Sequence, residues 1–339
     1  MAISLGSLNR LSLLIDIMNS LGRTLPASWF CSEALYQLER RAVFLKSWHF
    51  LGPVTRFQKR FEPLVYEIAQ VKIIVENRSP ESDDVNADGI VVFAEEKNRH
   101  IKSHLTPSGL VFATLSLDTP SFDEYFSGLE KLTNTVDFTK LPHRRSISYE
   151  GRFNWKTMID GFQECLHCQY THPTFSKFYP PTFYSVTNHT TFSQHVADPA
   201  KPSDGLFLYF FPICTLNVYG GGMSSFRTLP STNPGISRME FDYYHSGTDE
   251  EFEEYFKFVR QVAMEDFELC EKAQENLERG VYGEGILNPV KENGVLFYQG
   301  RVRECVYRQF EAEKVERERE KEGVLGEGKG AVAVGIVVQ

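Results

Sequence analysis

The first half of the chain contains several short runs of apolar, largely β-branched and aromatic residues, and these runs predict strands. A helix is predicted before them, over 28–46, and it leads into Trp48. The polar, turn-rich stretch 77–84 predicts a surface loop, and residues 120–131 predict a helical connection. The strands themselves are expected at 64–68, 71–75, 89–93 and 109–113. This part of the chain is therefore predicted to form a small β-rich unit.

After Arg145 the sequence predicts helices as well as strands, so an α+β arrangement is expected. A helix begins at Trp155, and a much longer one is marked by the capping box Thr248-Asp249-Glu250-Glu251 and by a stop at Gly280. The strands between these helices are predicted at 206–211, 215–219, 225–230 and 238–244. We therefore expect an antiparallel sheet that grips one long helix.

Composition narrows the possible partners and the compartment. The formal net charge of −9 argues against a nucleic-acid-binding protein, and no apolar run is long enough to cross a membrane. The six cysteines are scattered and do not resemble a disulfide framework, so a reducing, cytoplasmic location is expected. The apolar stretch 11–18 predicts an amphipathic helix packed on the body, and an organelle-targeting peptide is the alternative that stays open.

The helix expected over 155–169 carries two different faces. One side is an almost continuous apolar stripe, and the other gathers Asp160, Glu164 and His167. Such a polar cluster could simply be solvated. The neighbouring Phe162, Cys165, Cys168 and Tyr170 leave little of this helix suited to water, and this favours an interior cleft for the acids.

His167 and His172 are candidate metal ligands, although five residues separate them. On an ideal helix this spacing turns the two side chains about 140° apart. Pro173 pushes the preceding residue out of helical geometry, so His172 can turn back toward His167. The spacing is then compatible with chelation of one metal ion.

Asp266 lies within the apolar register of the long predicted helix, where a hydrophobic residue is expected. A charged carboxylate there costs several kcal/mol unless it is paired or bound to a metal ion. Both a metal ligand and a buried salt bridge with Arg or Lys fit this position. The register runs through Phe252, Phe256, Val259, Ala263, Cys270, Ala273 and Leu277.

These residues, with Asn154-Trp155-Lys156, resemble the catalytic domain of Rieske-type non-haem iron oxygenase α subunits, in the choline monooxygenase-like branch. The segment 164–173 resembles the iron motif of that family, 265–271 resembles its C-terminal ligand helix, and 23–48 resembles its entry segment. The resemblance implies a helix-grip catalytic domain at 119–310, a truncated β-rich remnant of a Rieske domain at 1–118, and a charged, low-complexity tail at 311–339.

The resemblance also implies a chemistry. His167, His172 and Asp266 would be the ligands of one Fe(II), and Glu164 would link the iron histidines to the electron-donating cluster. Glu164 and Asp160 are the candidate catalytic acids. Oxygen would hydroxylate a small quaternary ammonium substrate, as in glycine betaine biosynthesis. A ferredoxin or reductase would supply electrons, and the chain would form a homo-oligomer, a trimer by resemblance, with no nucleic acid or membrane as partner.

The sequence departs from the family at the [2Fe–2S] cluster, which needs two Cys and two His. No cysteine occurs between Cys31 and Cys165, so the cluster ligands are absent. Three interpretations stay open: a diverged protein, a chain that receives electrons from a partner, and an incomplete gene product that lacks a segment near 77–89. We expect the iron-binding fold to persist while ordinary turnover is impaired.

Two further hypotheses come from other classes of protein. Cys165-x-x-Cys168 with His172 could form a structural zinc knuckle, although a single C-x-x-C is weak evidence. Alternatively, the chain could be a catalytically silent paralogue that acts as an assembly or regulatory subunit.

Overall fold

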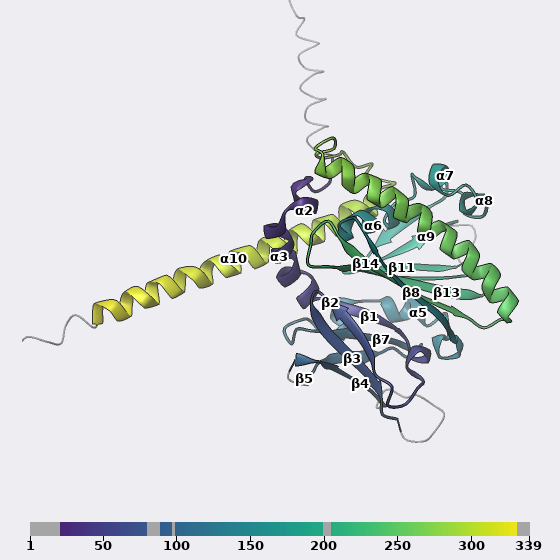
Figure 1. Cartoon of the computed structure of the whole chain (residues 1–339), viewed down its shortest axis with the longest axis horizontal. Helices are drawn as coiled ribbons and strands as arrows, with labels where there is room; N and C mark the ends of the chain where they lie inside the picture. The colour runs from purple at the N-terminus through teal and green to yellow at the C-terminus, as the bar shows by residue number, and fades with distance from the viewer. Residues whose placement is uncertain (1–20, 80–88, 97–98, 199–204, 331–339) are drawn as a thin grey trace, which may run out of the picture.

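A computed structural model describes residues 21–79, 89–96, 99–198 and 205–330, with side chains placed as far as residue 320 (Figure 1). The segment 11–18, for which a helix or a targeting peptide was expected, lies outside the described residues. So do the end of the tail, 331–339, and most of the loop predicted at 77–84. No helix in the described ranges has the length and apolar character needed to cross a bilayer.

The helix predicted over 28–46 is interrupted at Ser32. Its backbone is extended (φ −82°, ψ 121°), and its hydroxyl accepts the N–H of Leu35, so a second helix begins there. The N-cap geometry therefore breaks a helix that the apolar pattern alone would continue. The resulting elements are α2 (Ser28–Cys31), α3 (Glu33–Ala42) and the 3₁₀ turn η1 (Phe44–Lys46).

Two small antiparallel sheets make up the β-rich N-terminal unit, which confirms the strands predicted there to within two residues at either end. One sheet has the order β1-β7-β6 and the other β2-β3-β4-β5. The connection at 120–131 is helical but divided, because Gly128 adopts φ 85°. The strands are β1 (Trp48–Pro53), β2 (Leu64–Ile68), β3 (Val71–Asn77), β4 (Ile90–Ala94), β5 (Arg99–His100), β6 (Lys102–Leu105) and β7 (Leu110–Thr114); η2 (Val54–Phe57), α4 (Phe122–Tyr125), α5 (Leu129–Thr133) and η5 (Phe138–Lys140) complete the unit.

A seven-stranded antiparallel sheet forms the rest of the body, in the order β8-β14-β13-β12-β11-β10-β9. The long helix α9 (Asp249–Glu278) lies across it (Figure 1), with the predicted capping box at Thr248 and a left-handed Gly280 (φ 68°) at its end. The predicted sheet gripping one long helix is thereby confirmed. Its strands are β8 (His143–Gly151), β9 (Ser185–Asn188), β10 (Phe192–Val196), β11 (Leu206–Phe210), β12 (Cys214–Tyr219), β13 (Gly222–Pro230) and β14 (Ser237–His245).

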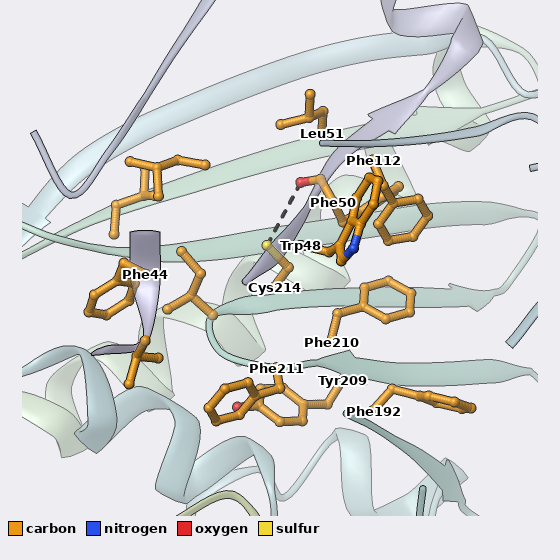
Figure 2. Close-up of a cluster of buried hydrophobic side chains, with 14 of the residues drawn as sticks. Phe44, Trp48, Phe50, Leu51, Phe112, Phe192, Tyr209, Phe210, Phe211 and Cys214 are labelled. Atoms are coloured by element: carbon orange, nitrogen blue, oxygen red, sulfur yellow. Dashed lines mark hydrogen bonds between the residues drawn. The ribbon is translucent and has the colours of Figure 1, made fainter. Parts of the chain in front are cut away.

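An aromatic core joins the N-terminal unit to this sheet. Figure 2 shows Phe44, Trp48 and Phe50 in one cluster with Tyr209 and Phe210 of β11, and the Phe50 and Phe210 rings lie 5.4 Å apart. The division proposed at residue 118 stays a prediction, but the hydrophobic core extends across it. A second cluster fills the space between β14 and α9, around Phe241 and Tyr243.

The helix predicted over 155–169 ends much earlier than expected. α6 (Trp155–Phe162) stops where the Gln163 side chain turns to the sheet, accepting a hydrogen bond from His195 at 2.8 Å. Two one-turn helices follow, α7 (Cys168–Thr171) and α8 (Phe175–Phe178). A tertiary contact of Gln163 thus ends a helix that the apolar stripe would extend.

A buried ion pair fixes α6 against the N-terminal helices. Lys156 Nζ lies 2.8 Å from Glu39 Oε1 of α3, and both side chains are fully buried. Trp155 Nε1 donates to the other Glu39 oxygen at 3.0 Å. The last helix, α10 (Asn293–Gly330), packs along α3 and then projects from the body (Figure 1), carrying the charge run predicted for the tail.

Candidate metal centre

The three predicted metal ligands come from two helices, α7 and α9. His167 is the N-cap residue of α7, and His172 follows the last residue of that helix with a non-helical backbone (φ −118°, ψ 66°), as expected of the residue before Pro173. Asp266 is in the middle of α9. The single turn of α7 therefore separates the two histidines without carrying them to opposite sides.

The ligand atoms of these residues converge on one point. His167 Nε2 lies 3.2 Å from His172 Nε2 and 3.3 Å from Asp266 Oδ1, and His172 Nε2 lies 2.9 Å from the same oxygen. They form a group of metal-ligating side chains in the described residues. Metal–ligand bonds of about 2.1 Å at right angles would place ligand atoms about 3.0 Å apart. The observed triangle has that size.

Carboxylates hold the outer nitrogens of both imidazoles. Glu164 Oε1 accepts from His167 Nδ1, and Glu265 Oε2 accepts from His172 Nδ1 at 2.8 Å. An Nδ1–H donor leaves the Nε2 lone pair free to bind a metal, and this carboxylate–histidine arrangement is typical of metal sites. Two lone pairs and a carboxylate then face one another, and they repel unless a cation lies between them. The donor set therefore fits a divalent metal ion.

The pKa shifts agree with a site built for positive charge. Burial opposes protonation of His167, but its hydrogen bonds to Asp266 and Glu164 outweigh burial and raise its pKa to about 10. Burial raises the pKa of Asp266, yet both imidazoles overcome this and hold it below its usual range. Without a metal ion the carboxylates therefore favour a proton on His167, and a metal ion bound at Nε2 would replace that proton.

Asp160 is not one of the three converging ligands, but it lines a cavity together with Glu164, His167 and Asp266. Its Oδ1 accepts from the hydroxyl of Tyr298 and, at 2.6 Å, from Gln299 Nε2. It therefore ties α6 to α10. Burial raises the pKa of Asp160 to about 7, although hydrogen bonds from Tyr298 and Gln299 oppose the rise. A catalytic role for Asp160 stays a prediction.

We expect replacement of Asp160 by asparagine to stabilise the protein at alkaline pH. The folded pKa of about 7 exceeds the ordinary value of 3.8, so folding takes up a proton between these values. Stability from this group is present below pH 4 and is lost as the pH rises through 7. At pH 8 the free energy of unfolding of the variant should exceed that of the wild type by about 1 to 2 kcal/mol, which thermal unfolding shows as a higher midpoint temperature. Near pH 4 the two midpoint temperatures should be the same. Replacement of the exposed Asp118 by asparagine is the control; an equal effect at both pH values would contradict the assignment.

A cavity with aromatic walls adjoins the ligand cluster. His167, His172 and Asp266 line one end of it, and no Lys or Arg is found among the lining residues in the described part of the chain. Burial lowers the pKa of His195 to about 3, so this lining residue is neutral near pH 7. The aromatic lining consists of Phe162, Phe175, Tyr179, Tyr184, Phe207, Tyr219, Phe226 and Phe241. A second cavity reaches the ligands from the other side, past Asp160 and α10.

The two cysteines that flank His167 are bonded to each other in the structure. Cys165 and Cys168 form a disulfide, and both line the aromatic cavity. In this state they offer no thiolate pair to a metal ion. The zinc-knuckle hypothesis therefore gains no support from the geometry, and the chain contains one disulfide that the cysteine spacing did not predict.

A [2Fe–2S] cluster does not fit the described residues of the N-terminal unit. Its histidines serve other contacts: His49 is buried against the Phe44 carbonyl at 2.8 Å, and His104 pairs with Glu130 at 2.9 Å. His100 is exposed on β5, and the sequence places no cysteine near any of them. The missing ligands predicted from the sequence are thus not replaced by another convergent set among these residues.

Glu265 is the residue of this centre to which the sequence assigned no role. It precedes Asp266 on α9, and its carboxylate reaches His172 from the exposed side of the helix. Its place next to a candidate ligand was the available signal, but the contact joins residues 93 positions apart. Sequence spacing alone could not have shown it.

Comparisons with known proteins agree with this arrangement. The family model described as "Ring hydroxylating alpha subunit (catalytic domain)" matches residues 138–198 and 193–308. The carnitine monooxygenase oxygenase subunit of Escherichia coli K12 is 25% identical, and the match covers 59% of this chain and 59% of that protein. The glycine betaine monooxygenase oxygenase subunit of Pseudomonas aeruginosa is 20% identical, and the match covers 45% of this chain and 46% of that protein. The matched segments therefore span less than two thirds of these relatives.

Solved structures share the fold. A quaternary ammonium Rieske monooxygenase in complex with L-carnitine superposes with a TM-score of 0.69 at 17% identity, covering 84% of this chain and 96% of the other. The naphthalene 1,2-dioxygenase of Rhodococcus sp. gives 0.60 at 13% identity, covering 84% and 94%. At these identities the likeness is one of fold.

Proposed function

This chain belongs to the ring hydroxylating alpha subunit family, and from that premise we propose that it binds one Fe(II) for the oxygen-dependent hydroxylation of a small quaternary ammonium compound. The triangle formed by His167 Nε2, His172 Nε2 and Asp266 Oδ1 is the observation that carries the proposal. Two imidazoles and one carboxylate on one face of an iron leave positions open for oxygen and substrate. When bound there, iron would supply the activation of oxygen.

The chain's own residues prepare this centre in three ways. Glu164 and Glu265 keep the imidazoles in the tautomer that presents Nε2 to the metal. Asp266 supplies the negative charge that favours a divalent over a monovalent ion. The aromatic walls exclude water and hold a substrate against the ligand cluster.

The lining of the cavity favours a quaternary ammonium substrate without a carboxylate. Tyr179, Phe207 and Tyr219 lie within 6.0 Å of one another, centroid to centroid, and aromatic faces attract such cations. The relatives that act on carnitine and glycine betaine take substrates that also carry a carboxylate. In this cavity a substrate carboxylate would lie near Glu164 and Asp266, and the described lining residues include no Lys or Arg to pair it. A choline-like substrate avoids that cost.

The proposed reaction needs electrons, and the ligands of the cluster that would deliver them are absent from the sequence. We infer that turnover is impaired unless a partner, a reductase or ferredoxin, or a neighbouring subunit of a homo-oligomer, supplies them. The same observation favours a second candidate, a catalytically silent subunit that retains the metal site and has an assembly or regulatory role.

Metal analysis with ligand binding tests the proposal. Purified chain, loaded anaerobically with Fe(II), should retain one iron without acid-labile sulfide, and choline should bind at least tenfold more tightly than glycine betaine, about 1.4 kcal/mol. Equilibrium dialysis measures both. Tetramethylammonium, which has neither hydroxyl nor carboxylate, is the matched probe for the aromatic walls. Failure to retain iron, or equal binding of choline and glycine betaine, would contradict the assignment.

A further inference from the structure

Two sulfur atoms lie beside the ligand cluster, and neither the family match nor the proposed function gives them a role. Cys165 and Cys168 flank His167 and form a disulfide, with their Cα atoms 5.1 Å apart. Both line the aromatic cavity together with His167, His172 and Asp266. The remaining cysteines of the described chain are free thiols.

The disulfide closes a small covalent ring of backbone and side-chain atoms that includes His167. On one side, Cys168 belongs to α7, and its carbonyl accepts from the His172 N–H at 2.9 Å and from the Ser176 hydroxyl at 2.7 Å. On the other side, Cys165 continues the turn that leaves α6. The bond therefore ties that turn to the start of α7, with His167 held between the two anchored sulfurs.

Other contacts hold this turn only in part. Glu164 accepts from the Leu166 N–H and from the His167 ring, and Gln163 pairs with His195. Opening the disulfide would remove the covalent tie across the turn and leave His167 held by the Glu164 carboxylate and by the Tyr170 and Thr171 N–H groups that donate to its carbonyl. More backbone and side-chain entropy would then be lost when a metal ion orders the ring.

The segment is also accessible from outside. Leu166 is 40% exposed and Tyr170 is 82% exposed, so this turn lies at the surface while the sulfurs face the cavity. The two cysteines themselves are buried, with Cys165 6% and Cys168 5% exposed, so a small dithiol has to reach them through the cavity that they line. The geometry thus combines a structural bond at a metal ligand with a route for its reduction.

We propose that Cys165 and Cys168 form a reversible thiol–disulfide site that positions His167, with a dithiol as the reductant. One thiolate of the dithiol attacks a sulfur of the Cys165–Cys168 bond and forms a mixed disulfide. Its second thiol then displaces the protein sulfur, leaving two protein thiols and an oxidised, cyclic reductant. Two electrons and two protons pass from the reductant to the protein. The disulfide form binds the metal ion more tightly, and this consequence rests on the proposed metal centre.

Thermodynamic linkage makes the proposal quantitative. If the disulfide tightens metal binding about tenfold, bound metal must stabilise the disulfide against reduction by the same factor. For a two-electron couple, tenfold corresponds to about 30 mV. The two effects are measured independently, so their agreement distinguishes a coupled site from a disulfide that merely braces the fold.

The test uses the intact chain with Co²⁺ as a spectroscopic probe. Metal affinity is measured for the oxidised protein and for protein reduced by dithiothreitol, and alkylation with mass spectrometry counts the thiols. We expect about tenfold weaker Co²⁺ binding after reduction, and a midpoint for disulfide reduction about 30 mV lower with Co²⁺ than without it. The double variant Cys165→Ser/Cys168→Ser should bind Co²⁺ like the reduced wild type and should not respond to dithiothreitol. Cys31→Ser, which removes an exposed thiol elsewhere, should behave like the wild type.

The outcomes separate this proposal from the metal centre itself. Equal Co²⁺ affinity in both redox states, or tighter binding after reduction, would overturn the thiol–disulfide proposal and leave the metal centre intact. Failure of both forms to bind Co²⁺ would overturn both. A protein whose Cys165 and Cys168 are alkylated without reductant would also overturn it, because the disulfide would not exist in solution.

Discussion

Asp266→Ala is expected to reduce iron affinity by more than about 100-fold and so to abolish stoichiometric binding. Loss of a residue that only supports a ligand already costs about 10- to 100-fold, and Asp266 is the only carboxylate in the ligand triangle. The variant should fold, because alanine favours a helix and the Asp266 side chain is partly exposed. Equilibrium dialysis of Fe(II) measures the affinity, and far-ultraviolet circular dichroism checks the fold.

Two neighbours on α9 provide the comparison for this variant. Glu268 is exposed two residues further on, so Glu268→Ala should bind iron like the wild type. Glu265→Gln keeps the shape of the side chain that accepts from His172 Nδ1 but removes its charge, and an intermediate loss of about 10- to 100-fold is expected. If Asp266→Ala retained full iron binding, the assignment of this ligand triangle would be wrong.

Lys156→Met is expected to destabilise the protein by about 3 to 5 kcal/mol, the second large effect. The Lys156–Glu39 pair is fully buried, and removal of the lysine leaves the Glu39 carboxylate buried beside a single neutral donor, Trp155. The loss should appear as a lower denaturant midpoint in chemical unfolding. Because the pair joins α3 to α6, we also expect a lower temperature of thermal inactivation of metal binding.

A paired variant separates the buried charge from lost packing. Glu39→Gln/Lys156→Met removes both charges while the glutamine oxygen still accepts from Trp155, so much of the stability should return. Lys131→Met, at an exposed position of α5, is the control and should shift the midpoint by less than about 0.5 kcal/mol. An equal shift for Lys131→Met and Lys156→Met would show that the buried pair contributes no more to the free energy of unfolding than an exposed lysine does.

The long helix illustrates what could be predicted from local sequence. Its capping box at Thr248 and its glycine at 280 are short-range signals, since each depends on residues within one turn, and α9 begins and ends where they indicate. The same holds for β2, β3 and β4, whose alternating burial reflects one buried face. Asp266 was conspicuous for a related reason: a single carboxylate interrupted an otherwise apolar stripe.

The end of α6 could not be predicted in this way. The apolar stripe continues to Gln169, yet Gln163 leaves the helix to pair with His195, which comes from β10 some thirty residues later. Because that contact exists only once the sheet has formed, local propensity overestimated the helix. The early end is also what lets His167 and His172 face each other.

The sequence by itself determined the classes of element, the ligand types and the absence of cysteines that a Rieske cluster would need. Only the tertiary structure decided that Glu265 supports His172, that Asp160 accepts hydrogen bonds from α10, and that the flanking cysteines are joined. The physical reason is the sequence separation between the residues that interact. Caps, periods and turns depend on neighbours within a few residues, whereas the partner of a buried polar group is set by whichever distant element the folded chain packs against it.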